Sequence, residues 1–357
     1  MKKIILAYSG GLDTSIILRW LQENYKAEII AYTSDIGQDM DKQKIVRNAK
    51  RLGVKKIIIE NLKNTFVKDY VFPMIRAHAL YEGVYLLGTS IARPLIAKRQ
   101  IAIAKKYKAY AVSHGSTGKG NDQIRFELGY AYFGKKIKVI APWREWTLQS
   151  RTDLIKYAKK NNIPIPKDKK GAPPFSVDDN IFHTSTEGKV LEDPKNSAPE
   201  FIFQRTTSPE KSPNKTTKVS IDFKYGDPIA VNGEKLSPEK LLEKLNTLAG
   251  NNGIGRVDLV ENRFIGIKSR GVYETPGGTV LYSAHRAIES VTLDKKRNQV
   301  SGKVVLGLYK GNITILSRIT KNKAYSMKKV SFEENKTFNK SKIEKFIKHH
   351  SKQLNKS

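Results

Sequence analysis

Cysteine is absent from the 357 residues of this chain. A chain without thiols forms neither a disulfide framework nor a thiolate metal site, which fits a cytoplasmic protein. Long hydrophobic runs are absent too, since no stretch of about 18 apolar residues occurs that would cross a membrane. The apolar run Ile4–Ala7 is interrupted at Ser9-Gly10-Gly11, too early for a secretory signal. We therefore expect a cytoplasmic protein without a membrane partner.

Acidic residues are scarce relative to basic ones. The chain has 34 Asp and Glu against 65 Lys and Arg, which gives a net charge of +31. An excess of this size can indicate a nucleic-acid partner. The lysines are spread along the whole chain rather than gathered in one arm, which favours the alternative of a lysine-rich surface. We therefore expect no nucleic-acid partner, and a positive potential that attracts anionic substrates.

The first half of the chain alternates between short apolar strands and amphipathic helices. Strands are predicted at Lys3–Tyr8, Ile29–Thr33, Lys56–Ile59, Ala109–Val112 and Lys138–Ile140. Helices are predicted at Thr14–Asn24, Asp41–Leu52, Phe66–Leu80 with a kink at Pro73, Ile91–Tyr107, Asp122–Tyr132 and Leu154–Lys160. This order predicts right-handed crossovers and an α/β fold, a doubly wound parallel sheet with helices on both faces. Ligands of such a sheet bind beyond the carboxyl ends of its strands.

Four prolines between Pro164 and Pro174 mark a break in this pattern. Beyond it, Lys218–Phe223 and Lys303–Tyr309 alternate like half-buried strands, and Pro238–Ala249 is typical of a helix. The second half therefore reads as an α+β domain. We expect three parts: an α/β domain at 1–165, an α+β domain at 172–335, and a helical arm at 340–357.

The helical arm is predicted over Ser341–Leu354. Ser341 and Glu344 have the spacing of a capping box. Its apolar residues fall on one side of a helix: Ile343, Phe346, Ile347, His350 and Leu354. Such an arm packs either on its own domain or on another subunit, and the pattern leaves both alternatives open.

The most specific signal is the string Ala7-Tyr8-Ser9-Gly10-Gly11-Leu12-Asp13-Thr14-Ser15, between the first predicted strand and the first predicted helix. Two adjacent glycines allow a sharp turn that brings backbone N–H groups close to an anion. The helix N-terminus adds partial positive charge, and the hydroxyls of the loop add further donors. Asp13 is unusual beside a phosphate. It is explained either by helix capping or by a metal ion shared with the phosphates.

This string is not a Walker A loop, because no Gly-Lys-Ser/Thr follows it. It resembles the pyrophosphate loop of the N-type ATP pyrophosphatases, which include GMP synthetase, asparagine synthetase and tRNA lysidine synthetase. Members of that superfamily cleave ATP between the α and β phosphates. The resemblance implies that the first domain binds ATP and that the loop holds the departing pyrophosphate.

Further strings narrow the resemblance. They are Tyr81–Pro94, Ser113–Phe126, Ala141–Trp146, Leu191–Pro194, Val260–Arg263, Lys268–Gly278 and Leu308–Asn312. Within the second string, Asn121, Asp122 and Arg125 have helical spacing, and Arg125 is suited to clamp a carboxylate in a bidentate way. Together these strings make the chain similar, over nearly its whole length, to the argininosuccinate synthase family.

The resemblance implies a ligase that joins citrulline to aspartate, using ATP and magnesium and releasing AMP and pyrophosphate. The citrulline ureido oxygen attacks the α-phosphorus, and the aspartate amine then displaces AMP from a citrullyl-adenylate. A ureido group is a poor electrophile until its oxygen becomes a phosphate ester. The protein therefore mainly needs to position reactants and stabilise phosphate charge. We find no general base, no nucleophilic triad and no set of metal ligands in the sequence, and the six histidines are scattered.

The resemblance also implies which residues bind the substrates. Residues 7 to 15, Ser34 and Gly115 are implied for ATP, with Ser34 acting through its backbone because the family often has alanine there. Thr117, Asn121 and Asp122 are implied for aspartate. The residues implied for citrulline are Tyr85, Ser90, Asn121, Arg125, Ser176, Ser185, Glu261 and Tyr273. Arg125 suits an α-carboxylate and Glu261 an α-amine, and Asp122 and Arg125 are the candidates for orienting the reactants.

The chain departs from the family between Lys296 and Val304. There the family has a longer segment with conspicuous aromatic residues, whereas residues 297 to 303 alone connect the two sides here. We still expect a homo-oligomer, but this shortening puts in doubt the helical part of the second domain and the tetramer of the family.

Two alternative functions are consistent with parts of the sequence. The charge of +31 would suit a tRNA-modifying enzyme with the same loop chemistry, although the missing cysteines argue against thiolation. Such an enzyme needs a basic groove with aromatic residues for stacking. The shortened segment would suit a catalytically silent nucleotide-binding protein, which binds ATP without releasing AMP.

Overall fold

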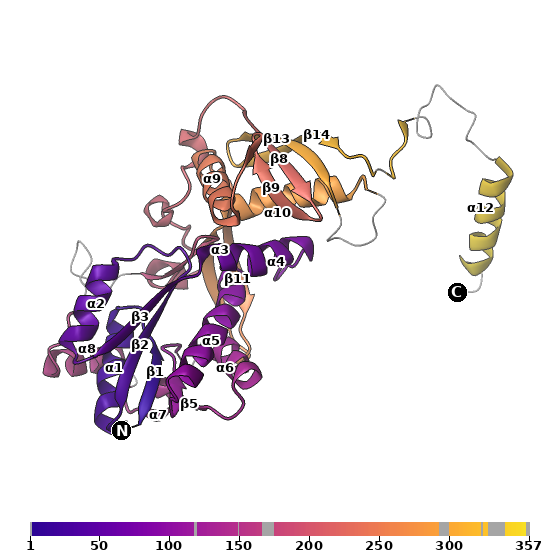
Figure 1. Ribbon diagram of the computed structural model, residues 1–357. Coiled ribbons are helices and arrows are strands. Elements are labelled where there is room, and N and C mark those ends of the chain that lie inside the picture. Colours follow the sequence, from indigo (N-terminus) through magenta and orange to yellow (C-terminus); the bar gives the residue numbers. More distant parts are fainter. Residues whose placement is uncertain are drawn as a thin grey trace.

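The computed structural model describes residues 2–117, 120–148, 150–165, 175–292, 300–322, 324–327 and 340–354. Within these ranges the chain forms three sheets (Figure 1). A parallel sheet has the order β3-β2-β1-β4-β5, and two antiparallel sheets have the orders β11-β12-β7-β6 and β10-β9-β8-β13-β14. The predicted combination of an α/β half with an α+β half is confirmed.

The parallel sheet is built from five short strands, all predicted from the sequence to within three residues. They are β1 (Lys3–Ala7), β2 (Glu28–Asp35), β3 (Lys56–Asn61), β4 (Ala111–Ser113) and β5 (Lys138–Ile140). Ile4 and Leu6 of β1 pack on one face, in the same cluster as apolar residues of α1 (Leu12–Tyr25), α2 (Lys42–Arg51) and α8 (Arg151–Lys160). Ile5 packs on the other face, with α5 (Gly88–Lys106) and α6 (Asn121–Phe133). This alternation is the period-two pattern of a strand buried on both sides.

The strand order reverses direction at β1, the central strand of the parallel sheet. β1 lies between β2 and β4. The loop after β1 leads to α1 on one face of the sheet, and the loop after β4 leads to α6 on the other face. A reversal of this kind opens a binding crevice beyond the strand ends. The predicted pyrophosphate loop and the Ser113–Phe126 string both begin there.

The segment predicted as a kinked helix over Phe66–Leu80 has a different structure. It consists of α3 (Lys63–Phe66), a π-helical turn at Val67–Val71 and α4 (Phe72–Arg76), with Pro73 in the first turn of α4. Because proline lacks an N–H and crowds the carbonyl four residues earlier, the wider π turn accommodates it without breaking the helix. The apolar residues of this segment pack in the core of the second half.

The second half contains two helices and nine strands among the described residues, besides short helical turns and α12. Its larger sheet comprises β8 (Thr217–Lys224), β9 (Asp227–Val231), β10 (Glu234–Lys235), β13 (Gly302–Tyr309) and β14 (Asn312–Ile319). α9 (Pro238–Asn251) and α10 (Pro276–Glu289) share one hydrophobic core with this sheet. The smaller sheet comprises β6 (Ser176–Asp179), β7 (Thr184–Glu187), β11 (Arg256–Asn262) and β12 (Lys268–Glu274).

The predicted arm forms α12 (Lys340–Leu354), which Figure 1 shows apart from the other elements. Ser341 is the second residue of this helix, so the predicted capping box is wrong. Ile343, Phe346 and Ile347 on its apolar side are exposed. Among the described residues, no helix is long and apolar enough to cross a membrane.

Candidate active site

The loop after β1 is held in a sharp turn by its glycines. Gly10 has a φ of +78°, and a Cβ at this position would lie 2.7 Å from Cγ1 of Ile45. Gly11 is the N-cap of α1, and no side chain caps the helix. Asn48 donates to the carbonyl oxygen of Gly10 over 3.2 Å, which fixes the turn from α2. The loop therefore presents the backbone amides of a helix N-terminus to the crevice.

Two pairs of hydroxyl groups brace this loop. Tyr8 Oη lies 3.1 Å from Ser15 Oγ, and Ser9 Oγ lies 3.0 Å from Thr14 Oγ1. Asp13 lies in the first turn of α1, whose cap position belongs to Gly11. Asp13 is therefore not the capping residue of α1, and the alternative of a metal ion shared with the phosphates stays a prediction.

Gly115 and Ser34 lie on either side of β1, in the loop after β4 and near the end of β2. A Cβ on Gly115 would lie 3.0 Å from Thr14 Cγ2, so glycine lets this loop lie directly against the first turn of α1. The Ser34 hydroxyl donates to Tyr32 Oη over 2.8 Å and is buried. Its side chain is thus engaged within the sheet, and a backbone contact of Ser34 with ATP stays a prediction.

Asp122 forms the centre of an ion-pair network at the N-terminus of α6. One carboxylate oxygen lies 2.8 Å from Arg125 Nη1, and the other lies 2.9 Å from Arg93 Nε. Arg93 also pairs with Asp178 of β6. Burial opposes ionisation of Asp122, but the two guanidinium groups outweigh it and hold the pKa of Asp122 below its usual value. The network joins α5, α6 and the smaller sheet through the carboxylate of Asp122.

The other two residues implied for aspartate lie at the same helix end. Asn121 Oδ1 accepts a hydrogen bond of 2.8 Å from the Phe264 amide in the β11–β12 turn. The Thr117 side chain is exposed, and its carbonyl oxygen accepts from the Gly120 amide over 3.1 Å. Gly120 caps α6 without a side-chain hydrogen bond, so a second uncapped helix N-terminus faces this region.

Four residues implied for citrulline lie on one face of the smaller sheet. Tyr273 of β12 is paired with Ser185 of β7. Ser176 of β6 is paired with Glu187, which lies two residues after Ser185 on the same strand. Glu261 of β11 is paired with Ser269, four residues before Tyr273. Directly paired residues and residues two or four apart share a face of a sheet. Ser176, Ser185, Glu261 and Tyr273 are therefore brought together by strand register.

Tyr85 joins this group by stacking on Tyr273. The two rings are 4.2 Å apart with an interplanar angle of 22°, and Tyr85 Oη accepts from the Thr89 amide over 3.1 Å. Burial raises the pKa of Tyr85 to about 12. A Cβ on Gly271 would lie 2.5 Å from Tyr273 Oη, so the ring lies over a glycine, where any side chain would displace it. This requirement for Gly271 is a feature that the sequence analysis missed.

Ser90 and Glu261 carry polar groups that are buried in this region. Ser90 Oγ has no hydrogen-bond partner among the described residues. Burial and the neighbouring Glu187 raise the pKa of Glu261, although a hydrogen bond with Tyr273 and the charge of Arg125 lower it in part. A buried hydroxyl and a buried carboxylate of this kind gain from a polar ligand that pairs with them.

Sequence reasoning missed three further residues that shape the site. Arg93 and Asp178 complete the network around Asp122. His183 is fully buried against Tyr85 and Tyr273, with Nε2 2.8 Å from Thr89 Oγ1, and burial lowers its pKa to about 3. Arg93 could have been found from the sequence, because it lies three residues after Ser90 and therefore on the same side of one helix. Asp178 and His183 could be assigned to the site only once the register of the strands was known.

His114 is a structural residue. Its ring is buried and stacked on Phe126, Nδ1 accepts from the Ser116 amide over 3.2 Å, and Nε2 lies 3.2 Å from Glu127 Oε1. The hydrogen bond from His114 and the charge of Arg144 lower the pKa of Glu127 to about 2, although burial opposes this. His114 thus fixes the loop that contains Gly115 and Thr117.

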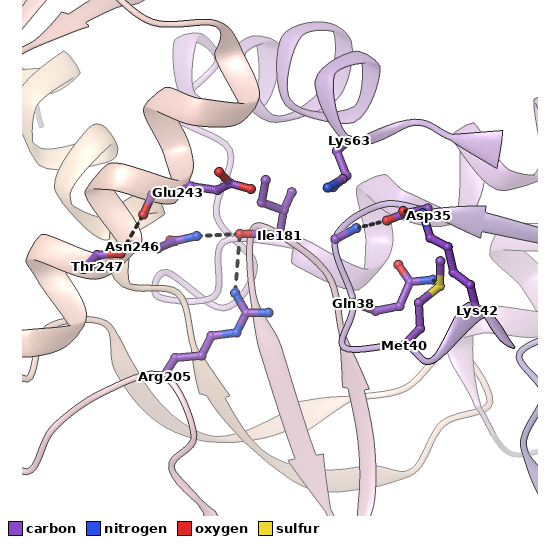
Figure 2. Close-up of a pocket in the computed structure, with 11 residues that line it drawn as sticks. Asp35, Gln38, Met40, Lys42, Lys63, Ile181, Arg205, Glu243, Asn246 and Thr247 are labelled. Atoms are coloured by element: carbon purple, nitrogen blue, oxygen red, sulfur yellow. Dashed lines mark hydrogen bonds and ion pairs between the residues drawn. The ribbon is translucent and has the colours of Figure 1, made fainter. Parts of the chain in front are cut away.

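A cavity of about 460 Å³ lies at the end of β2 (Figure 2). Asp35, the residue after Ser34, lines it. Figure 2 shows Asp35, Gln38 and Met40 on one side and Glu243, Asn246 and Thr247 of α9 on the other. Asn246 donates to the Ile181 carbonyl over 2.7 Å and so ties α9 to the loop between β6 and β7. The cavity thus lies between the end of β2 and α9 of the second half of the chain.

The crevice at the switch of strand order and the uncapped glycine turn define an α/β nucleotide-binding protein whose phosphate loop is not of the Walker type. The family model described as Arginosuccinate synthase N-terminal HUP domain matches residues 3–164. The model described as Arginosuccinate synthase C-terminal domain matches residues 175–299 and 293–357. The chain belongs to the argininosuccinate synthase family.

Individual relatives are similar over nearly the whole chain. An argininosuccinate synthase of Pelagibacter ubique is 72% identical, with 99% of this chain and 98% of that protein covered. One of Parvibaculum lavamentivorans is 55% identical, with 94% and 90% covered. A solved structure, a predicted tRNA methyltransferase subunit from Methanocaldococcus jannaschii, matches 44% of this chain and 75% of its own at 15% identity with a TM-score of 0.32.

The comparisons also bear on the short segment after Lys296. The alignment with the Pelagibacter protein runs over 389 positions, more than the 357 residues of this chain, so that relative carries residues without a counterpart here. The model of the C-terminal domain matches in two segments, which overlap at residues 293–299. These seven residues lie outside the described ranges.

Proposed function

We propose that this chain condenses citrulline with aspartate at the expense of ATP, giving argininosuccinate, AMP and pyrophosphate. One observation carries the proposal: the segment implied for aspartate lies between the loop implied for ATP and the sheet implied for citrulline. At one end Gly115 touches Thr14 of the phosphate loop. At the other, Asp122 is linked through Arg93 to Asp178, whose carbonyl accepts from Ser185 over 3.3 Å.

In the proposed mechanism the chain positions the reactants rather than supplying a nucleophile. Arg125 pairs with the citrulline α-carboxylate and Glu261 with its α-amine, which directs the ureido oxygen toward the α-phosphorus. Attack forms the C–O–P bond of citrullyl-AMP and breaks the bond to pyrophosphate, which the loop amides hold. The aspartate amine, placed beside Asn121 and Asp122, then attacks the ureido carbon. AMP leaves, and the nitrogen loses a proton.

Magnesium is part of the proposal. Asp13 lies in the first turn of α1 beside the phosphate loop, and oxygen ligands of this kind suit a hard cation. Bound with the phosphates, the ion would neutralise charge on the leaving pyrophosphate. We also propose, from the family, that the protein is cytoplasmic and forms a homo-oligomer.

A pyrophosphate-release assay tests the reaction. Purified chain is given ATP and Mg²⁺ with citrulline, aspartate or both, and pyrophosphate and argininosuccinate are measured. We expect sustained pyrophosphate release and equal argininosuccinate only with both amino acids. Release that requires tRNA would favour a tRNA-modifying enzyme, and ATP binding without any release would indicate a silent nucleotide-binding protein. Either result would overturn the proposal.

The raised pKa of Glu261 gives a prediction for citrulline binding. If Glu261 pairs with the α-amine, its ionised form binds, so the KM for citrulline should rise as pH falls toward the raised pKa, above the usual glutamate value of 4.5. Glu261→Gln should raise this KM roughly 30-fold or more, or about 2 kcal/mol, and remove the pH dependence of the KM for citrulline. Steady-state kinetics with citrulline varied at each pH measure both effects.

Stability separates this effect from unfolding. A carboxyl group whose pKa is raised on folding destabilises the native state above that pKa and regains stability as pH falls through it. Glu261→Gln should therefore be at least as stable as the parent chain at neutral pH in thermal unfolding. An unchanged citrulline KM in this variant would contradict the assignment of Glu261.

A further inference from the structure

A second cluster of chemically active side chains lies outside the substrate site. His78 follows α4, with a φ of +49°, and its ring nitrogen Nε2 lies 2.9 Å from Nδ1 of His285. The same Nε2 lies 3.2 Å from Oε2 of Glu289. His285 and Glu289 are one helical turn apart on α10, so two of the three groups are presented by a single rigid element.

The distances between the three groups are close to those of a metal site. All three ligand atoms lie within 4.8 Å of one another. In a tetrahedral zinc site, bonds of about 2.0–2.2 Å place neighbouring ligand atoms roughly 3.3 Å apart. His78 Nε2 lies 2.9 Å from His285 Nδ1 and 3.2 Å from Glu289 Oε2, so a small outward shift of the side chains would bring both distances to this value.

The surroundings hold the rings in place and leave a way in. His285 is fully buried against Phe223, whereas the side chains of His78 and Glu289 are 13% and 22% exposed. Tyr282, on the same helix, packs edge-on against the ring of His78. A buried ligand with two partly exposed ones is the arrangement that an ion can enter from solvent without opening the core.

We propose that His78, His285 and Glu289 form a binding site for Zn²⁺, with solvent as the fourth ligand. Two imidazole nitrogens and one carboxylate are the donor set of a borderline divalent ion, and magnesium and calcium favour oxygen ligands alone. The site is separate from the magnesium proposed at the phosphate loop. It does not depend on the proposed reaction.

The ion would join two segments that lead to the stacked tyrosine pair. The chain runs from His78 to Tyr85 within seven residues, and β12, which carries Tyr273, ends directly before α10. Zn²⁺ shared between His78 and α10 would brace these segments against each other. Because Zn²⁺ binds the native state, it should raise the unfolding temperature.

The test is a titration of the full chain after removal of metal with a chelator, without substrates and with Mg²⁺ in excess. With Co²⁺ as a probe, we expect visible d–d bands of a four- or five-coordinate site that saturate at one ion per chain. Zn²⁺ should abolish these bands and raise the unfolding temperature. His78→Gln and Glu289→Gln should each weaken Zn²⁺ binding about 100-fold, the upper end of the loss seen when only an outer-shell partner is removed.

A matched control addresses adventitious binding. His349 and His350 are adjacent and exposed on α12, so the double variant His349→Ala/His350→Ala removes a surface histidine pair and leaves the cluster intact. This variant should keep the Co²⁺ bands. Bands that vanish in it but persist in His78→Gln, or a wild-type chain that takes up no Co²⁺, would overturn the proposal. Circular dichroism of the metal-free variants shows whether each is folded.

Discussion

Asp122→Ala is expected to abolish turnover while ATP still binds. Asp122 holds Arg93 and Arg125 at the N-terminus of α6, and the alanine variant leaves both guanidinium groups without their shared carboxylate. Arg125 would then no longer be aimed at the citrulline carboxylate, and aspartate would lose a binding group. We expect kcat to fall by about 10³-fold or more, roughly 4 kcal/mol in the barrier. Argininosuccinate formation measures turnover, and equilibrium binding of ATP measures the first step.

Two companion variants make this result specific. Asp122→Asn keeps the shape of the side chain but not its charge, and should lose nearly as much activity with less effect on folding. Asp258 forms a similar pair with Arg270 on the opposite face of the smaller sheet, at 2.8 and 2.6 Å. Asp258→Ala should leave kcat within a few-fold of the parent. Wild-type turnover in Asp122→Ala would defeat our assignment of the site.

The sequence predicted the parallel sheet closely because local signals coincide there. Each strand is a short apolar run, the helices pack apolar residues against the sheet, and Ser150 with Asp153 forms a capping box at the start of α8. The glycine turn after β1 was predictable for the same reason, since its signal is contiguous in the chain. Nine adjacent residues contain the turn, the donors and the helix start.

The smaller sheet shows where such reasoning ends. Nothing in the sequence near Ser176 or Ser185 indicates that they share a face with Glu261 and Tyr273, because the register joins strands about 90 residues apart. The family resemblance supplied those residues without a physical reason. The same limit explains why the scattered histidines gave no sign of the proposed zinc site, since His78 and His285 are separated by 207 positions. Long-range pairing, not local propensity, creates both features.

Gly10→Ala is expected to abolish ATP binding, the second large effect. The φ of +78° is strained for alanine, and its Cβ would lie 2.7 Å from Cγ1 and 3.3 Å from Cα of Ile45. The backbone of α2 cannot yield easily, so the turn itself must shift and its amides must leave the phosphate position. We expect ATP affinity to fall by about 100-fold or more, the loss of two or three charge-assisted hydrogen bonds. Calorimetric titration with a non-hydrolysable ATP analogue measures this affinity.

Gly53 provides the matched control, since it has the same backbone conformation without the close contact. Its φ is +80°, and a Cβ added there would have the flexible Gln22 Nε2 as its nearest neighbour, at 3.9 Å. Gly53→Ala should cost about 1 kcal/mol of stability from backbone strain and leave ATP affinity unchanged. Adding Ile45→Ala to Gly10→Ala removes the overlap but not the strain, and should restore binding only in part. If Gly10→Ala bound ATP as tightly as Gly53→Ala, the triphosphate would have to lie elsewhere, because no anion could keep its contacts with amides that have moved.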